Sequence, residues 1–87
     1  MQVSGAEQAA IEYYHKKFGK DANQAFVHFA KEMGEFARGL EKGNAELMKL
    51  EATEMAALLL YFASLQGFDL LGNVAALYKK KLETVSL

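Results

Sequence analysis

A chain of 87 residues forms one domain at most, and a domain of this size buries only about 60% of the surface that its unfolded chain exposes. The absence of cysteine excludes disulfides, thiolate metal ligands and thiol nucleophiles. The formal net charge of −1, from 10 basic and 11 acidic residues, gives no electrostatic footprint for a nucleic-acid polymer or an anionic membrane. We therefore expect stabilisation by an oxygen-ligated metal, by self-association or by both.

Targeting and membrane signals are not apparent in the sequence. The N-terminal stretch MQVSGAEQ lacks the basic start and long apolar run of a secretion signal. The longest unbroken apolar run, Met55 to Ala63, is well short of the about 20 residues that span a bilayer. We expect a single domain over residues 1–87, located in the cytoplasm and not bound to a membrane.

The first two predicted helices are bounded by capping residues and glycines. Ser4 and Glu7 form a capping box that opens the first helix, which ends before Gly19. Asp21 opens the second helix, which ends before Gly43. Proline is absent, so glycine supplies the signals for helix ends.

The next two predicted helices have similar boundaries. Asn44 opens the third helix, which ends before Gly67, and Asp69 opens the fourth, which ends at the lysines of residues 79–81. The links between helices are short and polar, so neighbouring helices are expected to pack antiparallel. Without an alternating strand pattern or a repeat, the chain is predicted to be an all-α, four-helix antiparallel bundle.

The apolar residues of this predicted bundle indicate a partner chain. One face of the second helix carries Phe26, Phe29, Ala30, Met33, Phe36, Ala37 and Leu40. The third helix is apolar nearly all round between Met55 and Phe62, and such a helix is covered on more than one side. A chain this short has few elements to cover it, so we expect a second copy, in a homodimer or higher homo-oligomer.

Two glutamates of the third predicted helix lie close to the centre of its apolar stripe. On a helical wheel, Glu51 falls roughly 20° and Glu54 roughly 40° from that centre. An isolated ionised carboxylate in an apolar interior is costly, so it is paired, protonated or bound to a metal. The second predicted helix carries a similar pair, Glu32 and Glu35, at the edge of its apolar face.

Antiparallel packing of these two helices would bring four carboxylates together. They are Glu32, Glu35, Glu51 and Glu54. Such a set suits a hard, oxygen-seeking ion, Mg²⁺ or Mn²⁺, rather than zinc. The nearby basic residues Lys31, Arg38 and Lys49 lie mostly on outer faces of the wheel and are poorly placed to neutralise the set. A solvated helix face is the other interpretation, above all for Glu32 and Glu35.

Two segments resemble a known family. KEMGEF (31–36) and LEATEMAALLLYF (50–62) resemble the MazG-type all-α nucleotide pyrophosphohydrolases, whose pattern is Glu-x-x-Glu, a spacer, then Glu-x-x-Asp. The later GFDLLGNVAALYKKKL is similar to that family's Gly-hydrophobic-Asp-Leu turn and basic final helix. The likeness covers residues 26–81. It departs from the family at Glu54, where aspartate is usual, and at Leu77, where lysine is common.

The resemblance implies an enzyme dependent on Mg²⁺ (or Mn²⁺) that cleaves nucleoside triphosphates to nucleoside monophosphate and pyrophosphate. By position it assigns metal binding and catalysis to Glu32, Glu35, Glu51 and Glu54. It also suggests that Lys80 and Lys81 contact substrate phosphates, although favourable charges at a helix end are another interpretation of these lysines.

Two alternative functions and one further residue remain open. The EA step of LEATEM and the later VAALYKKK also resemble phosphoribosyl-ATP pyrophosphatase. A non-catalytic helical dimer, acting as an interaction or scaffold module, is an alternative of a different class. His28 lies one turn before Glu32 and could reach a phosphate or a metal-bound water, or it could be an ordinary surface histidine.

Overall fold

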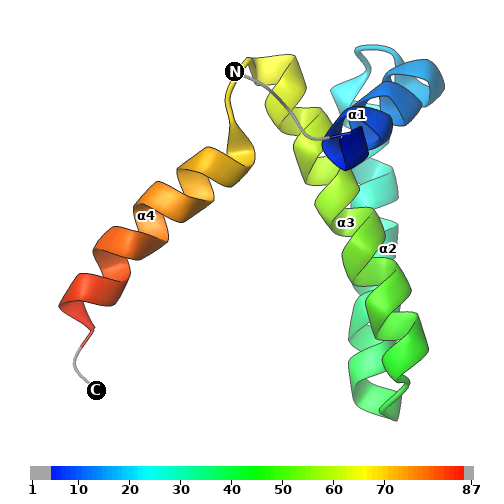
Figure 1. The fold of residues 1–87 in the computed structure, drawn as a ribbon. Coiled ribbons are helices and arrows are strands. Elements are labelled where there is room, and N and C mark those ends of the chain that lie inside the picture. Colours follow the sequence, from blue (N-terminus) through cyan, green and yellow to red (C-terminus); the bar gives the residue numbers. More distant parts are fainter. Residues whose placement is uncertain (1–4, 86–87) are drawn as a thin grey trace.

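The computed structural model describes residues 5–85, apart from the side chain of Ala6, and contains four helices over that range (Figure 1). They are α1 (Gly5–Phe18), α2 (Ala22–Lys42), α3 (Ala45–Gln66) and α4 (Leu70–Thr84). Residues 5–85 include no strand. The prediction of an all-α chain with four helices is confirmed.

Local capping explains where the last three helices begin. The side chains of Asp21, Asn44 and Asp69 each accept a hydrogen bond from the backbone N–H three residues later, which satisfies a donor that the first turn leaves free. Gly43 and Gly67 end α2 and α3 with φ angles of 65° and 75°, a conformation that favours glycine. The predicted Ser4 cap lies outside the described residues.

The fourth helix is longer than predicted. It continues past the three lysines to Thr84, and the N–H of Val85 still donates to the carbonyl of Lys81. The lysines favour a helix C-terminus electrostatically, but Leu82 and the residues that follow are all compatible with a helix. Charge at a helix end is therefore a weaker stop signal than glycine.

Two of the helices form a hairpin, a third packs against it and the fourth projects from it (Figure 1). Helices α2 and α3 lie side by side and run in opposite directions from the turn at Gly43. Helix α1 packs mainly on α3, near the end of the hairpin that is remote from this turn. Helix α4 leaves the end of α3 at an angle of 103° and does not lie along the hairpin. The single chain is therefore a three-helix unit with a projecting fourth helix.

The core is a small aromatic cluster where α1 meets the hairpin. Its buried members are Tyr14, Ala25, Leu58 and Tyr61, with Phe18, Phe29, Phe62 and Leu65 packed around them. The hydroxyl of Tyr61 donates to the carbonyl of Gly19 at 2.9 Å, which ties α3 to the link between α1 and α2. This anchored end of the hairpin positions the acidic residues described below.

Large apolar side chains remain exposed outside this core. The predicted apolar face of α2 is only partly covered, since Phe26, Met33 and Leu40 are exposed. Helix α4 contains no buried residue, although it carries five exposed large apolar side chains. These are Leu71, Val74, Leu77, Tyr78 and Leu82. The single chain thus leaves the sides of two helices without a packing partner.

No single helix of residues 5–85 combines the length and hydropathy needed to cross a bilayer. Only α3 and α4 taken together reach both criteria, and they are sharply bent where they join.

At Gly39 the backbones of α2 and α3 approach each other closely, and replacement of this glycine by alanine is expected to destabilise the protein by about 1–3 kcal/mol. A Cβ atom there would lie 2.9 Å from Cγ of Met48 and 3.2 Å from its backbone nitrogen. The side chain could move, but the backbone nitrogen belongs to α3, so the hairpin itself would have to open slightly. Chemical denaturation of the two proteins measures this loss.

Gly34→Ala is the matched control, because a Cβ atom there would meet nothing within 4 Å. Alanine is favoured over glycine inside a helix, so this variant should gain up to about 1 kcal/mol. Equal stabilisation by both substitutions would show that α2 and α3 are farther apart at Gly39 than the structure has them.

Candidate metal centre

Glu32 and Glu51 are the buried charged residues of residues 5–85, and they come from facing sides of α2 and α3. Their exposed fractions are only 6% and 5%. Both belong to helix stretches that carry apolar neighbours at helical spacing, so packing the apolar faces carries the carboxylates inward as well. The predicted inward position of Glu51 is confirmed. Glu54, one turn further along α3, is half-buried.

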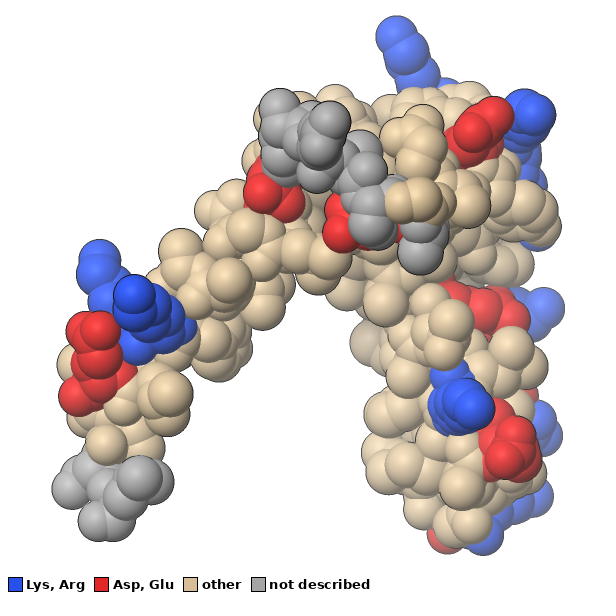
Figure 2. All heavy atoms as spheres, viewed as in Figure 1, with Lys and Arg blue, Asp and Glu red and all other residues tan. Residues whose placement is uncertain are grey.

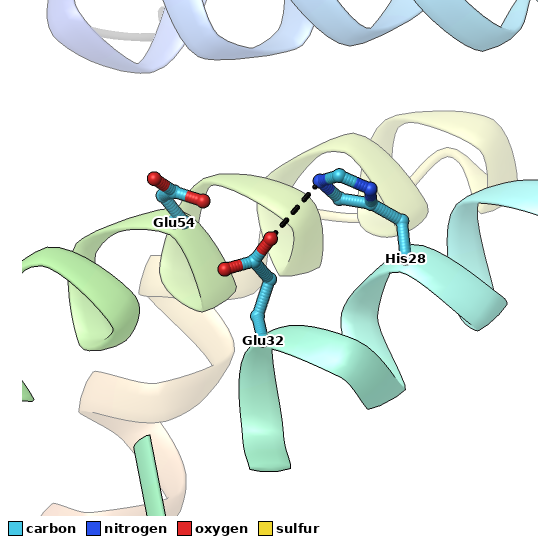
Figure 3. Close-up of side chains that lie close together, drawn as sticks. All are labelled: His28, Glu32 and Glu54. Carbon is cyan, nitrogen blue, oxygen red and sulfur yellow. Dashed lines mark ion pairs between the residues drawn. The ribbon is translucent and has the colours of Figure 1, made fainter. Parts of the chain in front are cut away.

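A histidine completes this group. His28 lies one turn before Glu32 on α2, and its Nε2 atom is 3.1 Å from Oε1 of Glu32 (Figure 3). One potential ligand atom from each of His28, Glu32 and Glu54 lies within 4.8 Å of the other two. Figure 3 shows the two α2 side chains and the α3 carboxylate pointing toward one another. We call His28, Glu32, Glu51 and Glu54 the acidic cluster.

The electrostatics of the acidic cluster disfavour full ionisation. Burial raises the pKa of Glu32 from its ordinary 4.5 to about 8, and hydrogen bonding and charge from Glu51 and Glu54 act in the same direction. One oxygen of Glu51, Oε2, is buried and has no hydrogen-bond partner within the described part of the chain. Among residues 5–85, no lysine or arginine forms an ion pair with these three glutamates. Of residues 5–85, His28 is the basic side chain that contacts these carboxylates, through Glu32.

Helix α1 covers the cluster with aromatic side chains. The rings of Phe18 and His28 have centroids 5.7 Å apart, and Tyr14 stacks on Phe18 at 5.8 Å. Burial, followed by the charge of Glu54 and then by Tyr13 and Glu32, raises the pKa of the Tyr14 hydroxyl. This hydroxyl consequently stays protonated at neutral pH and is available as a hydrogen-bond donor beside the carboxylates.

Comparison of the chain with protein-family models, with curated proteins and with solved structures found no match. The resemblance to MazG-type enzymes thus rests on the motifs quoted above, and the chemistry of the site has to be argued from its own residues.

The structure brings together three of the four carboxylates predicted to bind metal. Glu32, Glu51 and Glu54 meet between α2 and α3, whereas Glu35 forms an ion pair with Arg38 on the same helix. Arg38 is thus a neutralising partner that the helical wheel had placed on an outer face. The side chain of Glu35 is partly exposed, in contrast to that of Glu32.

The predicted substrate lysines lie elsewhere in the single chain. Lys80 and Lys81 are exposed residues near the end of α4, which points away from the hairpin (Figure 1). The ammonium group of Lys81 lies 5.7 Å from the ring centre of Tyr78 on the same helix. Neither lysine belongs to the acidic cluster.

The residues present fit a divalent cation. Carboxylate oxygens are the ligands that Mg²⁺ and Mn²⁺ prefer, and three carboxyl groups converge here. The unpartnered buried oxygen of Glu51 is an orphan that a cation would satisfy. The sequence left two interpretations of His28 open and did not indicate a role for Tyr14 in the site. The signal for His28 was its spacing of four residues from Glu32, which places both on one side of α2.

Proposed function

We propose that this protein is a metal-dependent hydrolase that cleaves nucleoside triphosphates to the monophosphate and pyrophosphate. The observation that carries the proposal is the meeting of Glu32, Glu51 and Glu54 in a partly buried site, where no lysine or arginine of residues 5–85 pairs with them. Buried carboxylates are paired, protonated or bound to a cation, and a hydrolase of phosphoanhydride bonds needs a cation. The MazG-like order of the carboxylates supports the choice of a nucleotide as substrate.

The proposed cation is Mg²⁺ or Mn²⁺, held by the carboxylates of Glu32, Glu51 and Glu54. When bound, such an ion neutralises phosphate oxygens and lowers the pKa of water, which supplies a nucleophile at neutral pH. Glu35 remains a proposed fourth ligand, but it has to release Arg38 before it can take part. Its contribution to metal affinity is therefore expected to be the smallest of the four.

The chain's own groups supply the remaining chemistry. One of the four glutamates can hold the attacking water and accept its proton as general base. The protonated hydroxyl of Tyr14 can donate a hydrogen bond on the α1 side of the site. The aromatic cover of α1 excludes water from that side and strengthens these interactions.

A melting experiment combined with a product assay tests the proposal. Millimolar Mg²⁺ or Mn²⁺ should raise the melting temperature, since a ligand at 100 times its dissociation constant adds about 2.7 kcal/mol to the free energy of unfolding. Pyrophosphate should then be released from at least one member of a panel of canonical and damaged nucleoside triphosphates. Phosphoribosyl-ATP belongs in the same panel, because a selective response to it would favour the alternative enzyme.

The result that overturns the enzymatic proposal is equally definite. If neither ion changes the melting temperature and no nucleotide yields pyrophosphate, the hydrolase proposal is wrong and the alternative of a helical interaction or scaffold module stands. Calcium serves as the control ion, because it also binds oxygen ligands but adopts larger and more variable coordination.

We further propose that the active protein is a homodimer, in which a second copy covers α4 and the open side of the hairpin. The accessible surface of the single chain is 6466 Å², whereas a compact monomer of 9.6 kDa has about 5,100 Å². The excess is larger than the about 800 Å² per partner of a standard interface. The radius of gyration, 14.8 Å, also exceeds the about 12 Å of a compact chain of 87 residues.

The surface of α4 fits an apolar partner of the same kind. Figure 2 shows uncharged side chains along most of α4, with charged ones gathered near its C-terminal end. A second copy offers the matching surface, because Phe26, Met33 and Leu40 of α2 are exposed in the same chain. In this arrangement Lys80 and Lys81 of one copy could approach the acidic cluster of the other, which would give them the predicted role toward phosphate.

The cavities of the single chain are consistent with a site completed by two copies. A cavity of about 490 Å³ lies between α1 and the link from α3 to α4, lined by residues such as Ile11, Leu60 and Phe68. No residue of the acidic cluster lines it. The proposed second copy would supply further walls for a nucleotide beside the acidic cluster.

Val74→Glu is expected to convert the dimer to a monomer. Val74 lies near the middle of the exposed apolar side of α4, so the change buries a carboxylate in the proposed interface at a cost of several kcal/mol. Light scattering coupled to size-exclusion chromatography measures the mass. Ala76→Glu adds the same group on the opposite side of α4 by helical spacing, and it should stay dimeric. A wild-type protein that elutes with the mass of one chain contradicts the dimer.

A further inference from the structure

Three side-chain atoms lie close to the ligand spacing of a single metal ion. Two ligands about 2.1 Å from one ion are about 3 Å apart at right angles and about 4.2 Å apart when opposite. Nε2 of His28 is 3.1 Å from Oε1 of Glu32, and one potential ligand atom from each of His28, Glu32 and Glu54 lies within 4.8 Å of the other two, a slightly wider spacing than one ion allows. Small side-chain rotations would bring all three atoms onto one ion, and one of the three is nitrogen.

We propose that Nε2 of His28 binds the metal ion directly, so that the site is a mixed nitrogen–oxygen centre that prefers Mn²⁺ to Mg²⁺. This inference rests on the proposed function, since it concerns the cation of the same site. Mg²⁺ is a hard ion that keeps oxygen ligands and waters, whereas imidazole binds first-row transition ions well. A single imidazole ligand therefore shifts the preference away from Mg²⁺.

Two further features support a metal ion held at this position. Phe18 packs against the imidazole with ring centroids 5.7 Å apart, which limits the space available to the ring. On α3, the exposed fraction of Glu51 is only 5%, and its Oε2 atom lacks a hydrogen-bond partner among residues 5–85. A buried oxygen without a hydrogen-bond partner points to a ligand beside it. A contact between His28 and Glu32 alone would not indicate this.

The position of Glu35 explains why the ligand set differs from an all-carboxylate one. Its side chain pairs with Arg38 and does not join the group of three ligand atoms. His28 occupies the side of α2 one turn before Glu32, whereas Glu35 lies nearly one turn after it. Nitrogen ligation by His28 thus takes the place that the fourth carboxylate was predicted to fill.

Pulsed electron paramagnetic resonance of the protein with Mn²⁺ alone tests the proposal directly. An imidazole bound to Mn²⁺ produces ¹⁴N modulation, which we expect in the wild-type protein and not in His28→Gln. The chain has two histidines, so His15→Gln is the matched control and should keep the signal. His15 Nε2 lies 3.1 Å from Oγ of Ser64, outside the acidic cluster.

Calorimetric titrations with Mn²⁺ and with Mg²⁺ provide the second measurement. Wild type should bind Mn²⁺ at least about 10-fold more tightly than Mg²⁺, and His28→Gln should lose most of this ratio by weakening Mn²⁺ binding. Retained helical circular dichroism shows that the variant is folded, and the wild-type resonance spectrum needs no variant at all.

The outcomes separate this inference from the function on which it rests. Mn²⁺ that binds without ¹⁴N modulation, or with an affinity equal to that of Mg²⁺, overturns nitrogen ligation and leaves the proposed hydrolase in place. A wild-type protein that binds neither ion overturns both. A ¹⁴N signal that survives in His28→Gln but disappears in His15→Gln places the metal elsewhere and also overturns the inference.

Discussion

Glu51→Gln is expected to remove the metal-induced rise in melting temperature and to lower the rate of pyrophosphate release by at least about 100-fold. That factor corresponds to about 2.7 kcal/mol of transition-state stabilisation. Glu51 is buried in the acidic cluster, and a neutral amide is a poor ligand for the proposed cation. Calorimetric melting with and without Mn²⁺, together with steady-state kinetics, measures both effects.

The same substitution should stabilise the metal-free protein by about 1–3 kcal/mol. It replaces a buried carboxylate, with one unpartnered oxygen, by an amide that can donate a hydrogen bond to the neighbouring carboxyls. Such opposite effects on stability and on metal response are not produced by general damage to the fold.

Glu46→Gln is the control for this variant, because Glu46 is an exposed residue in the first turn of the same helix. Its replacement should cost only a few tenths of a kcal/mol through the helix dipole and leave the metal response unchanged. Full metal dependence in Glu51→Gln would exclude Glu51 from the metal site.

The metal-free protein is expected to lose stability as pH rises from about 4.5 to about 8, by up to about 1.4 kcal/mol per pH unit from Glu32. Burial and the neighbouring carboxyls raise the pKa of Glu32 in the folded state, so the folded chain keeps a proton that the unfolded chain has released. Raising the pH removes that proton from Glu32 in the folded protein, which lowers the free energy of unfolding. Denaturation with urea across this pH range measures the free energy of unfolding.

Two comparisons isolate the contribution of Glu32. Glu32→Gln cannot titrate, so its stability should depend less on pH than that of the wild type over the same window. Saturating Mn²⁺ should also reduce the slope or reverse it, because the cation competes with the proton for the same carboxylate. Parallel stability curves for wild type and Glu32→Gln would show that Glu32 has an ordinary pKa in the folded protein.

The helices were predictable because their boundaries depend on local interactions. Asp21, Asn44 and Asp69 satisfy backbone donors within their own helices, and Gly43 and Gly67 adopt left-handed conformations within three residues of the helix ends. Nothing distant in the chain has to be known for these features. The same holds for the inward position of Glu51, which follows from helical spacing alone.

The arrangement of the site was only partly predictable because it depends on rotamers and on packing between helices. Glu35 has the same spacing relative to Glu32 as Glu54 has to Glu51, yet an arginine three residues later turns it to a different partner. His28 joined the cluster because α3 brings Glu54 to its side of α2. Few contacts within the chain fix the direction of α4. This direction therefore could not be predicted from the sequence of the link between α3 and α4.

The exposed fourth helix has a consequence for how the molecule forms. A helix of 15 residues is marginal in water on its own, and α4 receives almost no support from the three-helix core. Its structure must therefore be stabilised largely by whatever covers it. If that cover is a second copy, the ordering of α4 and the association of two chains are a single coupled event, and the helix content of the protein follows its concentration by mass action.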